Sequence, residues 1–223
     1  MDVLLGRLGI SVTYSAAEHV GLYSLFHRDA RNKVLHWALV PVVMVTAMVF
    51  GSALATPWSL PLPGWDVPIN ITLLAVVMTV GSFLTISVAG ALAFAAWIIP
   101  SMALTNHIVA TVPVWQALLV AFVLQCAAWF GTVVIGHMRY EPTVDGGAAG
   151  PLDSNLYLKG WNRMRGFGRE PSPVEAFTQF AISPLSNTLD LLFALGLCKG
   201  LEREIATVRE RAAQRIREGR APL

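Results

Sequence analysis

The stretch VLHWALVPVVMVTAMVFGSALA, residues 34–55, decides the fold class of this chain. It contains no Asp, Glu, Lys or Arg, and it is as long as the run of about 20 apolar residues that an α-helix needs to cross a bilayer. The pattern continues, because Asp66 is the single formal charge between Val34 and Met138. A stretch of that length without Lys or Arg cannot be the surface of a soluble domain. The sequence therefore predicts an all-α fold, a polytopic bundle of transmembrane helices.

The overall composition supports a membrane protein. Hydrophobic residues make up 55% of the chain and charged residues 13%, whereas soluble domains have about 45–50% and 25%. The net charge of +2 is too small to indicate nucleic acid as a partner. Cys126 and Cys198 both lie in apolar stretches, where single cysteines are usually small buried side chains rather than disulfide partners.

The distribution of basic residues predicts how often the chain crosses the membrane. Residues 71–99 form a second uncharged run, which is long enough for one long helix or for a hairpin of two short ones. Basic residues precede the first span and follow the span at 115–137, and such residues favour the cytoplasmic side. Both flanks lie on one side only if an even number of helices crosses between these two spans. We therefore predict a hairpin at about 71–87 and 88–104, four spans in total, and both termini in the cytoplasm.

The flanking segments are predicted to lie at the membrane surface. Residues 1–33 are polar enough for an interfacial helix, and charged residues interrupt the apolar segment at 174–197, which favours a re-entrant or interfacial helix pair hinged at Ser183–Pro184. The tail is predicted to be an amphipathic helix resting on the membrane. Its apolar residues share one face: Leu201, Ile205, Val208, Ala212 and Ile216. The chain thus divides into a membrane-embedded helical domain, 1–200, and a basic amphipathic tail, 201–223.

Histidines at the ends of the apolar segments are the residues best suited to chemistry. There are five of them: His19, His27, His36, His107 and His137. Imidazole is a ligand of Fe, Zn and Cu, so one interpretation is a metal site, and the other is that these residues cap helix ends or contact lipid headgroups. His27 and His36 are nine residues apart, about half a turn on an unbroken helix, so they could meet only if the chain bends near 29–32. The sequence has no HExxH motif, phosphate loop or GxSxG elbow.

Two short stretches resemble the signatures of a known family. LYSLFHRDARNKVLHWALVP, residues 22–41, is similar to the N-terminal signature of the 2-hydroxy fatty acid (2-hydroxypalmitate) dioxygenases, small polytopic membrane proteins of the fungal endoplasmic reticulum with bacterial relatives. The matching residues are Phe26, His27, Asn32 and His36. GHMRYE, residues 136–141, is similar to the second signature, which is Gly-His, three residues and Glu. The chain departs from the family in a long insertion at about 143–170.

The resemblance implies an enzyme that binds Fe(II) and uses O2 to shorten a long-chain 2-hydroxy fatty acid by one carbon, as in fatty acid α-oxidation. It assigns the iron ligands to His27, His36 and His137. Asn32 and Glu141 would orient these imidazoles, and Arg28 or Arg31 would pair with the substrate carboxylate. The residues themselves leave simpler roles open, since Asn32 could cap the first membrane helix and Glu141 could pair with Arg139.

Other functions remain compatible with the sequence. A non-catalytic protein that binds or organises the membrane would use the same interfacial histidines to contact headgroups. A transporter is disfavoured, because the spans lack the charges that mark transport paths. Desaturase-like oxidases carry more histidines, in tight HxxxH and HxxHH clusters. The abundance of Ala, Val and Arg favours a bacterial inner membrane over the endoplasmic reticulum.

Overall fold

The structure, a computed structural model, describes residues 15–25, 27–54, 56–62, 65–141, 143–145, 151–153 and 181–218. Its elements in chain order are α2 (Ala16–Ser24), α3 (Ala30–Ala53), β1 (Ser59–Leu62), β2 (Trp65–Pro68), α4 (Ile71–Ile86), α5 (Val88–Thr111), α6 (Val114–Trp129), η1 (Phe130–Tyr140), β3 (Thr143–Asp145), β4 (Pro151–Asp153), α10 (Ile182–Ala194) and α11 (Lys199–Arg217). Helices dominate the described residues, and the strands form two small antiparallel ribbons. The predicted all-α helical bundle is confirmed.

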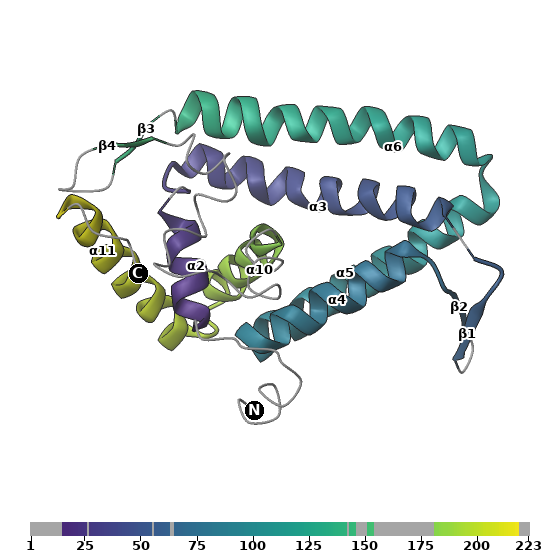
Figure 1. The fold of residues 1–223 in the computed structure, drawn as a ribbon, viewed down its shortest axis with the longest axis horizontal. Coiled ribbons are helices and arrows are strands. Elements are labelled where there is room, and N and C mark those ends of the chain that lie inside the picture. The colour runs from purple at the N-terminus through teal and green to yellow at the C-terminus, as the bar shows by residue number, and fades with distance from the viewer. Residues whose placement is uncertain are drawn as a thin grey trace.

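Four long helices alternate in direction (Figure 1). α3 runs away from the end that holds α2, α4 returns, α5 runs out again, and α6 continues into η1 and returns beside α3. The predicted hairpin is therefore present, and it turns at Ser87. The extended backbone of Ser87 ends α4, and its Oγ accepts a hydrogen bond from the N–H of Gly90 (3.1 Å), which caps α5. α5 extends to Thr111, beyond the predicted end at 104.

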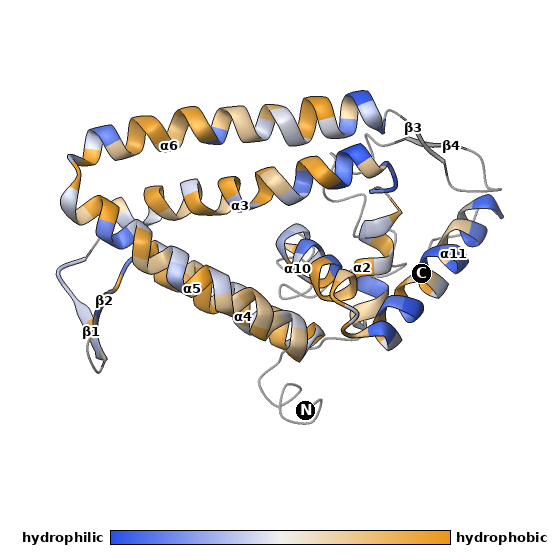
Figure 2. Cartoon of the chain, turned by 180° about the vertical axis from the view of Figure 1, so that it is seen from behind, coloured by the Kyte–Doolittle hydropathy of each residue, from blue (hydrophilic) through white to orange (hydrophobic). Residues whose placement is uncertain are grey.

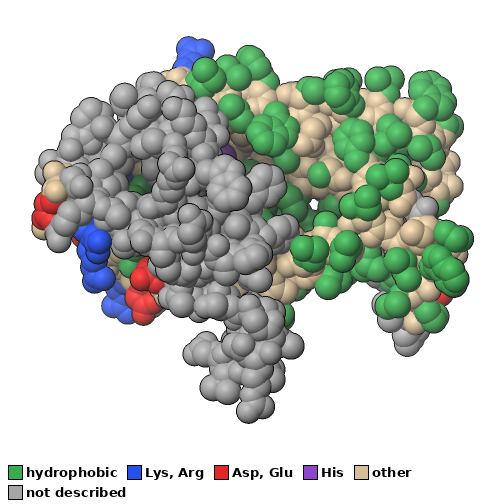
Figure 3. All heavy atoms as spheres, in the orientation of Figure 1, with side chains coloured by type: hydrophobic (Ala, Val, Ile, Leu, Met, Phe, Trp, Pro, Cys, Tyr) green, Lys and Arg blue, Asp and Glu red, His purple; other side chains and the backbone are tan. Residues whose placement is uncertain are grey.

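The exterior of this bundle suits a bilayer. Three helices are long and apolar enough to cross one: Ala30–Ala53, Val88–Thr111 and Val114–Tyr140. At most 33% of the most apolar 18 residues of each helix is buried inside the protein. Apolar residues predominate in the long helices (Figure 2), and large hydrophobic side chains cover the face of these helices that Figure 3 shows. α4 is the fourth member of the alternating set but has only 16 residues, about 24 Å of helix. The protein is thus a polytopic helical membrane protein.

The first span contains Pro41, and α3 continues through this residue. A proline inside a helix removes one backbone hydrogen bond and presses on the preceding turn. Membrane helices tolerate this because packing with neighbouring helices supports them. Here α3 packs along its length against α6, η1, α4 and α5, so the helix passes the proline without ending.

Three further helices, α2, α10 and α11, gather at the charged end of the bundle (Figures 1 and 2). α11 packs against α2 so closely that a Cβ atom at Gly21 would lie 2.9 Å from Cγ1 of Val208. Ile205 and Ala212 are buried in the same region. The apolar face that we expected to rest on the membrane therefore packs against the protein. The side chain of Ile216 and residues 219–223 lie outside the described part of the chain.

The expected hinge at Ser183–Pro184 is the start of a helix. Both residues lie in the first turn of α10, where a proline costs little because its missing N–H would have no partner within the helix. The actual break follows α10, where Gly196 and Cys198 have positive φ angles of 79° and 54°. The preceding residues, 174–180, lie outside the described part of the chain.

The connection between α3 and α4 forms a ribbon at the opposite end of the bundle (Figure 1). β1 pairs with β2 in antiparallel register, with Ser59 opposite Pro68. Trp58 precedes β1 and is 71% exposed. An exposed indole beside the end of a membrane span is typical of the aromatic belt at the bilayer interface.

Candidate metal centre

His27 and His36 meet because the chain bends between them. α2 ends before His27, and α3 begins at Ala30, where the Asp29 side chain caps the helix. The bend lies just before the stretch in which we expected it, so Asn32 is inside α3 and is not its cap. The two imidazole rings lie edge to face with their centroids 4.6 Å apart.

His137 joins them from the end of the fourth long helix. It lies in η1, a π-helix of 11 residues, and π-helical segments are rare and frequent at functional sites. Its ring centroid is 4.8 Å from that of His27 and 5.1 Å from that of His36. One nitrogen atom of each histidine lies within 4.8 Å of the other two, and all three residues are buried. We call these three residues the histidine cluster.

Tyr23 fixes the orientation of His27. Its backbone carbonyl oxygen lies 3.0 Å from Nδ1 of His27, and its phenol ring stacks on the imidazole at 3.8 Å. A carbonyl oxygen only accepts hydrogen bonds, so Nδ1 must carry the proton and Nε2 of the neutral ring has the lone pair. Metal-binding histidines commonly donate their second nitrogen to such an oxygen.

His36 is held by α10. Its backbone carbonyl accepts a hydrogen bond from Nδ2 of Asn187 (2.9 Å). Its Nδ1 lies 3.5 Å from Oγ of Ser183, which in turn contacts the hydroxyl of Tyr23 at 2.8 Å. Its Nε2 is buried and has no hydrogen-bond partner among the described residues. A buried imidazole nitrogen without a polar partner is costly, and a metal ion would satisfy it.

Glu141 ties the cluster together from the end of η1. Its Oε1 accepts hydrogen bonds from the backbone N–H groups of Arg28 (2.6 Å) and Asp29 (2.9 Å). Its Oε2 accepts one from Nδ2 of Asn32 (2.6 Å) and lies 3.6 Å from Nδ1 of His137. This last distance is too long for a hydrogen bond, so the carboxylate acts on His137 through its charge. Glu141 thus lies beside one imidazole, and Asn32 reaches the cluster through Glu141; their role towards a metal stays a prediction.

Gly136, the glycine of the second signature, lies where a larger residue would not fit. A Cβ atom at Gly136 would lie far inside van der Waals contact with Oδ1 of Asn32. Asn32 cannot easily move away, because its amide nitrogen is bound to Glu141 and the residue is completely buried. Gly136 therefore lets η1 approach α3 closely enough to bring His137 to the cluster.

Two arginines of the first signature lie at the protein surface. Arg28 is exposed and uses its backbone N–H at this site. The Arg31 guanidinium donates hydrogen bonds to Asp29 at 2.9 and 3.1 Å and lies over the ring of Tyr140. These bonds lower the pKa of the Asp29 carboxyl to about 2, so the helix cap stays charged at neutral pH. Phe26 lies outside the described residues.

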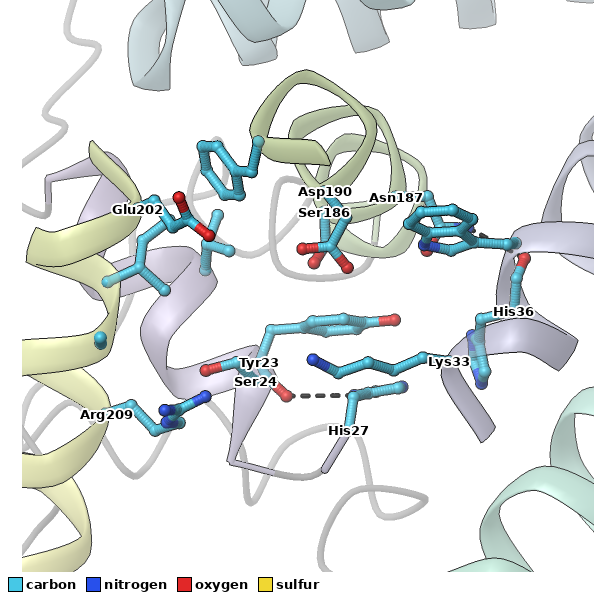
Figure 4. A pocket seen from close by; sticks show the side chains of 15 residues that line it. Tyr23, Ser24, His27, Lys33, His36, Ser186, Asn187, Asp190, Glu202 and Arg209 are labelled. Carbon is cyan, nitrogen blue, oxygen red and sulfur yellow. Dashed lines mark hydrogen bonds between the residues drawn. The ribbon is translucent and has the colours of Figure 1, made fainter. Parts of the chain in front are cut away.

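A cavity of about 190 Å³ opens beside the histidine cluster. His27 and His36 form part of its wall, and the rest comes from α2, α3, α10 and α11 (Figure 4). Its charged side chains are Lys33, Asp190, Glu202 and Arg209. The arrangement can therefore hold a metal ion on buried imidazoles and a polar molecule next to it.

Sequence reasoning missed several residues of this site. Lys33 precedes His36 by three residues, a spacing that places both on one helix face, so this residue could have been found. Asp190 is a carboxyl in an apolar helix, which is a known mark of function in membrane proteins. Arg209 is one of several arginines in the tail, and Tyr23 is one aromatic residue among many, so no spacing distinguishes either.

The donor set fits a metal ion. Three buried imidazoles suit Fe, Zn or Cu, and Glu141 provides a negative charge beside them. Metal–nitrogen bonds of about 2.1 Å can reach all three rings after small side-chain rotations from the present spacing. Within the described residues, His19 and His107 are not part of this group.

The sequence matches no family model, no curated protein and no solved structure. The resemblance to the 2-hydroxy fatty acid dioxygenases therefore stays a prediction that rests on the two signature stretches.

Proposed function

We propose that the chain is an integral membrane dioxygenase that binds Fe(II) and shortens long-chain 2-hydroxy fatty acids by one carbon. The observation that carries the proposal is the convergence of His27, His36 and His137 in one buried cluster. These residues come from two distant stretches of the sequence, which makes a chance meeting of imidazoles a poor explanation. The likeness of both signature stretches to the dioxygenase family favours iron over zinc or copper.

The proposed reaction breaks the bond between C1 and C2 of the acid. One 2-hydroxy acid and one O2 give a fatty acid with one carbon fewer, one CO2 and one water. Four electrons pass from the two carbon atoms to O2. Bound iron would supply the redox chemistry with O2, which amino-acid side chains lack.

The chain's own residues would bind the substrate and orient the iron ligands. Tyr23 holds the imidazole of His27 in place, Glu141 places a negative charge beside His137, and burial of the cluster excludes bulk water. The polar head of the substrate would enter the adjacent cavity while its acyl chain stays among apolar helices and lipid. This geometry suits an acid whose reacting carbon atoms are next to its carboxylate.

The proposed location is a bacterial inner membrane, with the histidine cluster at the cytoplasmic side. The start of α3 and the end of η1 lie at the same end of the bundle (Figure 1). That end carries the basic residues that flank the spans, including Arg28, Lys33 and Arg139. Basic flanks favour the cytoplasmic side, so both described ends of the chain would be cytoplasmic.

The test is the metal content of the purified protein. The chain is purified in detergent without chelator, loaded anaerobically with Fe(II), and analysed for bound metals beside the variants His27→Ala, His36→Ala and His137→Ala. We expect about one iron per chain in the wild type and a loss in each of the three variants. His107→Ala is the matched control, because His107 is an exposed histidine of α5 outside the cluster.

Conversion of 2-hydroxypalmitate and O2 to pentadecanoate and CO2 by the loaded protein would complete the test. If the protein binds iron but does not convert this acid, the proposed substrate is wrong and the proposed metal site stands. Absence of any bound metal would favour the alternative of a non-catalytic membrane-binding protein.

A further inference from the structure

The cavity beside the histidine cluster contains two cations that face each other. Lys33 from α3 and Arg209 from α11 point into it from opposite sides (Figure 4). Both are half-buried, and neither has a carboxylate within 4 Å in the described part of the chain. The Nε atom of Arg209 is buried and has no hydrogen-bond partner there. Half-buried charges of one sign favour the binding of an ion of opposite charge.

Two carboxyl groups also line the cavity, but neither lies within 4 Å of these cations in the described part of the chain. Oε2 of Glu202 accepts a hydrogen bond from Nζ of Lys199 (2.8 Å), a cation outside the cavity wall. Burial raises the pKa of the Asp190 carboxyl, although the charge of Lys33 opposes this effect. The two carboxyl groups therefore leave both cations without a carboxylate partner among the described residues.

We propose that this cavity binds the carboxylate of the fatty acid, with the ammonium group of Lys33 and the guanidinium group of Arg209 as its cationic partners. The identity of the acid rests on the proposed function. Arg28, which the sequence suggested for this role, is exposed and does not line the cavity. A guanidinium group can bind both oxygens of a carboxylate, and the ammonium group adds a second charge.

The position of the cavity relates this binding to the reaction. His27 and His36 form part of its wall, so a carboxylate held there lies beside two of the proposed iron ligands. C2 is bonded directly to the carboxyl carbon and must then lie at the same place. Lys33 and Arg209 are thus specificity-determining residues, which select an acid over an alcohol of the same length.

The test compares two ligands that differ in the carboxylate alone. Dissociation constants of 2-hydroxypalmitate and hexadecane-1,2-diol are measured by calorimetry on the full chain in detergent after removal of metal by chelator. We expect the wild type to bind the acid more tightly. Lys33→Gln and Arg209→Gln should each weaken binding of the acid by roughly 10- to 100-fold, the usual effect of losing a charge-assisted hydrogen bond, and leave the diol unchanged.

Matched variants separate this effect from damage to the fold. Arg203→Gln removes an exposed arginine of α11 that does not line the cavity, and it should bind both ligands as the wild type does. Arg209→Lys keeps the charge and should retain much of the preference for the acid. Helix content and elution volume identify a variant that has unfolded.

Three outcomes would overturn the proposal: equal wild-type affinity for acid and diol, an undiminished preference in both glutamine variants, or equally good competition by phosphatidylglycerol. The last result would mean that the cavity accepts any anionic lipid. Because the measurement uses metal-free protein, it is independent of the iron analysis. A chain that binds iron but shows no preference refutes this inference alone, and a chain that shows the preference without iron refutes the dioxygenase alone.

Discussion

At the scale of single residues, Glu141 is the side chain that organises the histidine cluster. It accepts three hydrogen bonds, from two backbone N–H groups before α3 and from the amide of Asn32. It also places a negative charge 3.6 Å from Nδ1 of His137. A carboxylate in this position orients the imidazole and increases its affinity for a cation.

Replacing Glu141 with Gln tests this role. The amide would keep one oxygen for the backbone N–H groups, but its NH2 group would face the NH2 group of Asn32, and the negative charge beside His137 would be lost. We expect the affinity for Fe(II) to fall about 10- to 100-fold. Anaerobic titration against a competing chelator measures this change.

Glu18→Gln is the control for that experiment, because Glu18 is a carboxylate of the α2 capping box and does not contact the cluster. It should leave iron affinity unchanged. If Glu141→Gln binds iron as tightly as the wild type, Glu141 serves to join η1 to α3 and has no effect on the metal.

At the scale of elements, the close approach of η1 and α3 depends on Gly136. Ala at this position would push against Oδ1 of Asn32, which is held by Glu141. Overpacking of this kind costs about 1–3 kcal/mol of stability, and it would displace His137 from the cluster. We expect Gly136→Ala to unfold at lower temperature and to bind iron more weakly.

Gly81 in α4 offers a matched comparison, because a Cβ atom there would contact nothing within 4 Å. Gly81→Ala should be neutral or stabilising by up to about 1 kcal/mol, the difference in helix propensity. Thermal unfolding in detergent, followed by circular dichroism, measures both variants. Equal unfolding temperatures for the two would show that α3 and η1 have room to separate.

The elements also show which features the sequence can predict. The hairpin between α4 and α5 followed from the requirement for an even number of crossings, and its turn at Ser87 was marked by a residue that both ends and caps helices. The three histidines that meet in the cluster followed from short signatures with fixed spacing. By contrast, the path of α3 through Pro41 and the packing of α11 on α2 depend on contacts between distant segments. Spacing within one segment gives no information about such contacts, so Arg209 could not be predicted.

At the scale of the whole molecule, the alternation of the long helices is what assembles the site. His36 lies near the start of α3, and His137 lies near the end of η1. They can meet only if α3 and the α6–η1 helix are antiparallel, as they are when the α4–α5 hairpin lies between them (Figure 1). The alternation of helices that we predicted from the basic flanks is therefore also the arrangement that places the three histidines together.

The antiparallel arrangement predicts on which side of the membrane each connecting segment lies. In a chain with Cys126 and Cys198 changed to Ser, single cysteines are introduced at Arg28 before α3, at Ser59 in the β1–β2 ribbon and at Glu210 on α11. All three positions are exposed. An impermeant maleimide should label positions 28 and 210 from the cytoplasmic side and position 59 from the opposite side. The reason is that α3 is the single span between positions 28 and 59, whereas the four long helices α3, α4, α5 and α6–η1 lie between positions 28 and 210.

Labelling of 28 and 59 from the same side would mean that α3 does not cross. Labelling of 28 and 210 from opposite sides would mean an odd number of crossings and would place α11, with Arg209, on the wrong side of the bilayer for the cavity to exist.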